Sequence, residues 1–150
     1  MVLCGHGTRD REARGPLDAL TPARALVIWV RRFLCRLCGV SCTVGPAGML
    51  SRRRYTGLAI ALALTLWGLE RVPAVDVRAR VSPDRQLGFT AGAGWASLSR
   101  WAQAVTWGTV AVASGSRGRA CETAERLIAR SPLPMTASHV ERAVAAAQIS

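Results

Sequence analysis

The sequence contains no lysine and no asparagine, and only nine acidic residues stand against 20 arginines. The absence of Lys and Asn beside abundant Arg, Ala and Gly is the pattern that GC-rich codons produce, so the use of Arg instead of Lys says little about a ligand. The formal net charge of +11 does not depend on that choice. Such a charge on 150 residues favours a polyanionic partner, with nucleic acid ahead of an anionic membrane surface.

A long apolar run is also missing from the chain. The longest such stretch, 57–69, would span roughly 20 Å as a helix, whereas the hydrocarbon core of a bilayer is about 30 Å thick. We therefore expect a buried helix and no membrane association. The N-terminus has no apolar segment behind a basic start, as a secretory signal would have. We expect a cytoplasmic protein whose thiols stay reduced, so clustered cysteines favour metal over disulfides.

Catalytic groupings are not evident either. A nuclease of the transposase type needs three carboxylates gathered around metal ions, and no acidic residue here ends a predicted core strand. His6 and His139 have no recognisable nucleophile beside them. We expect a protein that is not an enzyme and that has no small-molecule substrate.

The hydrophobic pattern predicts one strand followed by five helices. The strand covers 25–34, and apolar residues at helical spacing predict helices at 55–69, 73–81, 95–107, 121–130 and 140–149. Ser138 and Glu141 have the spacing of a capping box that begins the last helix. The expected fold is mainly α, a helix-turn-helix-like helical core with a small N-terminal zinc-ribbon-like β element. The expected divisions are 1–50 (zinc-ribbon-like), 51–115 (helix-turn-helix-like) and 116–150 (helical tail).

Cysteines cluster at the end of the predicted strand. Cys35 and Cys38 have the CxxC spacing that lets two thiolates reach one tetrahedral zinc, with Gly39 suited to the turn. The further ligands would come from Cys42, Cys4 and His6. Met1 stands where a first cysteine paired with Cys4 would lie, so the second knuckle is incomplete. The alternative is a set of small buried thiols that bind nothing, as we expect of the distant Cys121.

The helix at 95–107 has two different faces. Leu98 and Trp101 lie on its apolar side, and the other side contains small residues with one Arg and one Gln. Arg can read guanine and Gln can read adenine in the major groove, so this side is a candidate DNA-reading face; the alternative is an ordinary solvated face. Its candidate residues are Ser97, Ser99, Arg100 and Gln103.

Two arginine clusters could bind phosphates or simply keep the protein soluble. The first consists of Arg31, Arg32 and Arg36, and the second of Arg52, Arg53 and Arg54.

The order of these parts resembles a family of uncharacterised bacterial proteins related to insertion-sequence transposases. The resemblance consists of a CxxC knuckle, Pro46, the ArgArgArgTyr motif at 52–55 and the SerLeuSerArgTrp motif at 97–101, and it covers about residues 4–107. It implies a zinc ribbon followed by a helix-turn-helix, with Cys35 and Cys38 as zinc ligands and 97–103 in the recognition helix. The missing knuckle cysteine departs from the family pattern.

The function expected from the sequence is a non-catalytic module that binds double-stranded DNA, with a transposase or a second copy of the chain as a further partner. One alternative is a small membrane-associated protein that inserts the 57–69 helix. Another is a remnant of a mobile-element protein without a function of its own.

Overall fold

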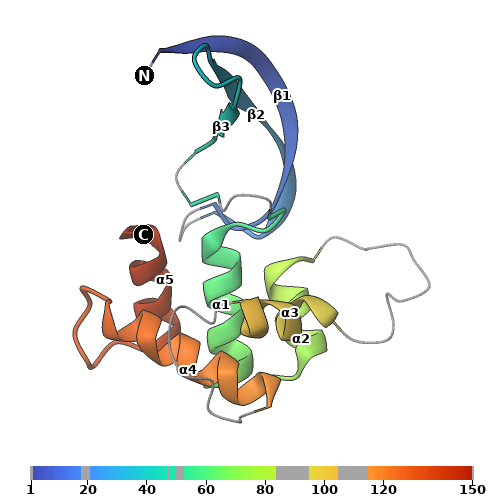
Figure 1. The fold of residues 1–150 in the computed structure, drawn as a ribbon. Coiled ribbons are helices and arrows are strands. Elements are labelled where there is room, and N and C mark those ends of the chain that lie inside the picture. The colour runs from blue at the N-terminus through green and yellow to red at the C-terminus, as the bar shows by residue number, and fades with distance from the viewer. Residues whose placement is uncertain are drawn as a thin grey trace.

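The computed structural model describes residues 2–17, 21–46, 48–49, 53–83, 95–104 and 115–149. These residues form a three-stranded antiparallel sheet and five helices. The two long strands form a curved ribbon that extends away from the helices, with the N-terminus at its far end (Figure 1). We call this ribbon the arm and the group of helices the helical body.

The arm is built from β1 (Leu3–Gly15), β2 (Arg24–Cys35) and the short β3 (Ser41–Val44), in the order β1-β2-β3. β1 pairs with β2 from Leu3 opposite Cys35 to Gly15 opposite Arg24, with one irregularity between Gly5 and Thr8. The sequence-based strand at 25–34 is confirmed as β2.

The expectation of a mainly α, helix-turn-helix-like fold with a zinc-ribbon-like β element is wrong, because the sheet is a major part of the molecule. The error lies mostly in β1, which has the sequence LCGHGTRDREARG and shows no alternation of apolar and polar residues. Its strand conformation comes from backbone pairing along nearly the whole of β2. Such pairing depends on the partner strand and leaves little trace in local sequence.

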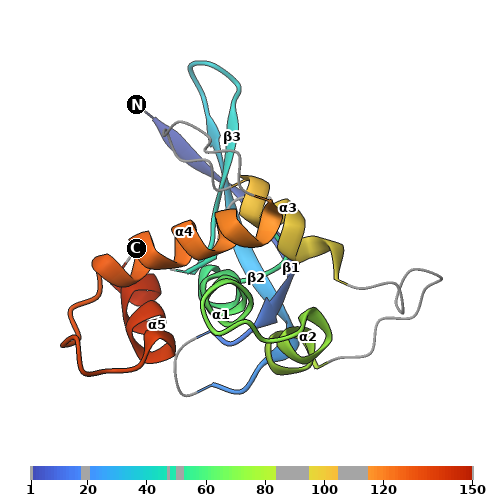
Figure 2. The ribbon, with the colours of Figure 1, turned by 90° about the horizontal axis from the view of Figure 1, so that it is seen from below.

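Helix α1 (Gly57–Gly68) is the centre of the helical body. It is apolar on all sides, and nine of its residues are buried, among them Ala59, Ala63 and Leu64. Seen along its axis, α1 is surrounded by α2 (Ala74–Val81), α3 (Ala96–Ala104), α4 (Ser116–Ala129) and α5 (His139–Ile149) (Figure 2). The expectation of a buried helix at 57–69 is therefore confirmed, and within the described residues no helix is both long and apolar enough to cross a bilayer.

Three aromatic rings join the start of α1 to α3. The ring of Tyr55 packs edge-on against Trp95 and Trp101, with centroid distances of 5.7 and 4.9 Å, and the two Trp rings are 5.0 Å apart. All three residues are buried. The ArgTrp pair of the predicted recognition helix is thus divided, because Trp101 belongs to the core while Arg100 is exposed.

The remaining helices begin and end close to their predicted positions, with one exception. Helix α4 begins at Ser116, before the predicted start of this helix at residue 121. The predicted capping box is confirmed: the Ser138 hydroxyl accepts from the Glu141 N–H, and the Glu141 carboxylate accepts from the Ser138 N–H at 2.9 Å. The last three residues of the predicted helix at 95–107 lie outside the described residues.

The crossing of α1 and α4 depends on Gly68. A Cβ placed there would lie 2.6 Å from the backbone nitrogen of Cys121 and 2.8 Å from the carbonyl carbon of Ala120. Alanine is favoured over glycine in a helix by about 1 kcal/mol. However, overpacking against backbone atoms typically costs about 1–3 kcal/mol. We expect Gly68→Ala to lower the free energy of unfolding by about 1 kcal/mol, measured by urea denaturation.

Gly5→Ala is the matched control for this substitution, because nothing lies within 4 Å of a Cβ built at Gly5. A Gly68→Ala protein as stable as wild type would show that the two helices do not cross this closely. Gly68→Val should be more destabilising still, since it adds two methyl groups at the same contact.

The capping box makes the stability of α5 depend on pH. Hydrogen bonds from Ser138 lower the pKa of the Glu141 carboxyl below its usual range. This stabilisation is therefore complete above the pKa of an unfolded Glu and is lost as the pH falls through the lower pKa of the folded state. We expect wild type to exceed Glu141→Gln in Tm at pH 7, and this difference to shrink as the pH falls from 7 to about 2 and the carboxyl is protonated. A difference that stays constant between these pH values would contradict the prediction.

Candidate nucleic-acid interface

Four arginines meet where the arm joins the helical body. Arg11 and Arg14 lie on β1, and Arg53 and Arg54 lie in the segment that leads into α1. The Arg11 guanidinium donates to the Arg53 carbonyl at 2.6 Å. Glu12 pairs with Arg14 at 2.6 Å and with Arg54 at 3.5 Å. We call these five residues the base cluster. Its net charge is positive because it contains four arginines and one carboxylate, which pairs with two of them.

Backbone contacts hold the base cluster together. The Arg14 N–H donates to the Arg54 carbonyl at 2.8 Å, and the Thr56 N–H donates to the Arg14 carbonyl at 3.0 Å. Thr56 also caps α1, accepting from the Ala59 N–H at 3.0 Å while its hydroxyl donates to the Pro16 carbonyl. The strand and the start of α1 are therefore fixed to each other, and so are the arginines on both.

Helix α3 lies next to this cluster through its aromatic contact. Tyr55 directly follows Arg54, and its ring packs on Trp101 of α3. Arg100 and Gln103 of α3 are exposed, whereas Ser97 and Ser99 are half-buried. The structure therefore exposes only the Arg100 and Gln103 part of the predicted face of 97–103.

The other predicted arginines are on the arm or outside the described residues. Arg31 and Arg36 are exposed, and Arg32 is half-buried on the opposite side of β2 from Arg31. Arg52 lies outside the described residues. The structure thus joins Arg53 and Arg54 to Arg11 and Arg14, which the sequence did not indicate. The sequence signal for this meeting is the charge-dense ArgAspArgGluAlaArg stretch of β1. That stretch does not show by itself which other residues it contacts.

The predicted zinc ligands do not form a complete site. Cys35 and Cys38 lie in one turn, and Cys42 on β3 shares the sheet face of Cys35. Cys4 pairs with Leu34, which places it on the opposite face of the sheet from Cys35, and His6 lies at the irregularity of β1. Among the described residues no three His, Cys, Asp or Glu side chains gather closely enough to hold a metal ion. A four-ligand zinc site does not fit this arrangement.

The turn at Cys35 has its own electrostatic effect. The Cys35 sulfur accepts hydrogen bonds from the backbone N–H groups of Cys38 and Leu37 and interacts with the Cys38 thiol, and these contacts lower the pKa of Cys35. The opposite holds at Cys121, where burial and the nearby Glu125 raise the pKa of the thiol. The two cysteines therefore differ in the pH at which they become nucleophilic.

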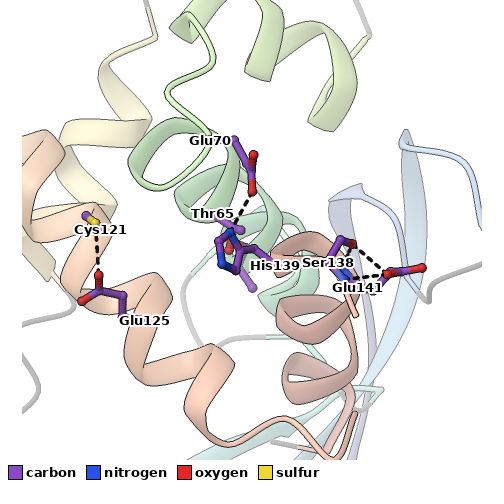
Figure 3. Close-up of polar contacts among 8 residues, drawn as sticks. Thr65, Glu70, Cys121, Glu125, Ser138, His139 and Glu141 are labelled. Atoms are coloured by element: carbon purple, nitrogen blue, oxygen red, sulfur yellow. Dashed lines mark hydrogen bonds and ion pairs between the residues drawn. The ribbon is translucent and has the colours of Figure 1, made fainter. Parts of the chain in front are cut away.

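Three other polar contacts of the helical body lie within single helices or link α5 to the chain after α1. Figure 3 shows His139 Nδ1 at 3.0 Å from Glu70 Oε1, and the Cys121 thiol at 3.6 Å from Glu125. Thr65 is fully buried, and its hydroxyl donates to the Ala61 carbonyl of its own helix at 3.0 Å. The His139–Glu70 contact connects α5 to the end of α1.

Comparison with known proteins adds nothing to this geometry, because no family model, no curated protein and no solved structure matches the chain. The resemblance to transposase-related proteins stays a prediction from the sequence.

The thiol environments predict an order of reactivity. Iodoacetamide reacts with thiolates, so the pH at half-maximal alkylation follows each pKa. We expect this midpoint to be lower for Cys35 than for Cys121 when labelling is followed by peptide mass spectrometry. Cys38→Ala should raise the Cys35 midpoint only in part, since the backbone donors remain. Equal midpoints, or the reverse order, would contradict the hydrogen bonds described.

Proposed function

We propose that this protein binds double-stranded DNA without catalysing a reaction on it. In this proposal the arginines of the base cluster contact phosphates, and the exposed side of α3 reads base edges through Arg100 and Gln103. The observation that supports it best is the placement of four arginines where the arm joins the helical body. Arg14 and Arg54 share the Glu12 carboxylate, and Arg11 bonds to the backbone carbonyl of Arg53. The phosphate backbone supplies much of the affinity in such complexes.

The geometry supports this division of roles. The contact between Tyr55 and Trp101 fixes α3 relative to the residues just before α1. The proposal requires that one docked orientation uses both. Phosphate contacts position a protein on the duplex, and contacts to base edges provide sequence preference. The total charge of +11 favours association with a polyanion over long range.

Insertion of α1 into a membrane is less compatible with the packing. Its residues Ala59, Ala63 and Leu64 are at most 2% exposed, because the other helices pack around α1 and Gly15 of β1 lies against Ala59. Insertion would require the helical body to open and would expose the core that α1 supports. A surface interaction with anionic lipid would remain, and it is an outcome of the test below.

Fluorescence anisotropy with a labelled duplex, measured across a salt series from about 50 to 200 mM, tests the proposal. We expect the double substitution Arg53→Ala and Arg54→Ala to weaken binding. It should also reduce the slope of log K against log salt by about 2, or roughly 0.9 per lost phosphate contact. Arg100→Ala should change the preference among sequences more than the salt slope.

The control replaces Arg80 and Arg130 by Ala, since both are exposed and lie away from the base cluster. It removes the same charge and should leave the slope nearly unchanged. Equal losses in both double variants would reduce the proposal to general attraction by net charge. Absence of duplex binding, with recovery of the protein on anionic vesicles, would overturn it.

A further inference from the structure

One tryptophan of the arm is exposed to solvent. Trp29 lies in the middle of β2 and is 78% exposed, unlike Trp95 and Trp101, which form the aromatic core. Its neighbours along the same face of β2 are Val27, which is 69% exposed, and Arg31. Large apolar side chains gathered on a surface usually mark a place where something binds.

The register shows which residues share this face. Directly paired residues of an antiparallel sheet lie on the same side, so Asp10 lies beside Trp29 and Glu12 beside Val27. Val44 of β3 pairs with Arg31 and is also exposed. We call this surface the open face, and it consists of Asp10, Glu12, Val27, Trp29, Arg31 and Val44.

The other side of β2 is covered. Val30 and Ala13 are 1% exposed, and Leu26 and Ile28 are half-buried. Since alternate side chains of a strand point to opposite sides, the arm has a covered face and an exposed face, although β2 is apolar on both. The exposure of Trp29 therefore follows from the register and is not the fraying of a chain end.

A second copy of the chain is a poor occupant for the open face. One Trp offers at most about 250 Å² of surface, and with two valines it falls short of the roughly 800 Å² per partner that stable complexes bury. Two chains with a charge of +11 each would also repel one another.

The charge around the open face suits a nucleic acid strand. Arg31 lies on the face itself, and the guanidinium groups of Arg14 and Arg54 reach the face through their ion pairs with Glu12. These three arginines outnumber the two carboxylates, Asp10 and Glu12, whereas Arg9 pairs with Val30 and lies on the other side of the arm. A ring flanked by cationic groups is the arrangement by which proteins bind unpaired nucleotides, with bases on the aromatic ring and phosphates on the arginines. Bases within a duplex are already stacked and do not offer their flat faces to a side chain.

We infer that the open face binds single-stranded DNA, with an unpaired base stacked on Trp29 and its phosphates near Arg31. The Glu12 carboxylate is engaged by Arg14 and Arg54, so its charge opposes the strand less than a free carboxylate would. The Asp10 carboxylate beside the ring is placed to accept from an exocyclic amino group such as cytosine N4. The inference rests on the proposed DNA binding and adds a second form of DNA to it.

An abasic strand separates stacking from phosphate contact. The full chain is titrated into a labelled 20-nucleotide single strand, an abasic strand of equal length, and the duplex. We expect Trp29→Ala to weaken binding to the normal strand about tenfold, which is within the range for loss of base stacking. Binding to the abasic strand and to the duplex should stay unchanged, and Trp29→Phe should restore most of the affinity because it keeps an aromatic face.

Met135→Ala is the matched control, because Met135 is 81% exposed and lies between α4 and α5. Circular dichroism checks that each variant is folded. Equal effects of Trp29→Ala on all three DNAs, or no effect on any, would overturn the inference. If wild type still bound the duplex, the proposed function would be unaffected by that result. Failure of wild type to bind any DNA would overturn both.

Sedimentation velocity on wild type and Trp29→Ala tests whether the open face is an interface between two copies of the chain. Monomers in both cases agree with the inference. A wild-type dimer that Trp29→Ala dissociates would overturn it, because the open face would then be an interface between two copies.

Discussion

The burial of α1 on all sides is the constraint on which the rest of the structure depends. A helix without a polar face must be surrounded, and in this chain α2, α3, α4 and α5 each cover part of it. Close approach requires small residues at the contacts, which explains why Gly68 meets the backbone of α4 and why Ala59 and Ala63 are fully buried. The other helices take their positions from this one element.

The start of α1 also fixes the arm relative to the helical body. Thr56 caps the helix and binds the chain at Arg14 and Pro16, while the preceding Tyr55 packs on α3. A single short segment therefore fixes the orientation of β1 and of α3 relative to the core. The arginines of the arm and those before α1 are held close together by these backbone contacts, although their like charges repel.

The helices could be predicted from the sequence because their signals are local. The apolar run at 57–69 and the Ser138–Glu141 capping box each indicate a structure by themselves, and both are present. The sheet could be predicted only in part, because β1 is defined by its partner. The candidate site divides in the same way: exposure of Arg100 follows from helical spacing, whereas the meeting of Arg11 with Arg53 depends on long-range pairing. The cysteine spacing indicated a knuckle turn, but the sheet places Cys4 on the opposite face from Cys35.

The sequence of β2 does not predict which of its two sides is exposed, and so it could not identify the open face. The segment LVIWV is apolar at every position, so a shift of one residue would bury Val27 and Trp29 and expose Ile28 and Val30 with little change in composition. The backbone of Arg14 bonds to Arg54 and Thr56, which fixes the side of β1 that faces the start of α1, and the pairing of β1 with β2 places Trp29 on the other side. The contacts that gather the arginines therefore also decide which side of the arm faces solvent. In the two proposals, phosphate contact by the base cluster and base stacking on Trp29 therefore depend on the same attachment between β1 and α1.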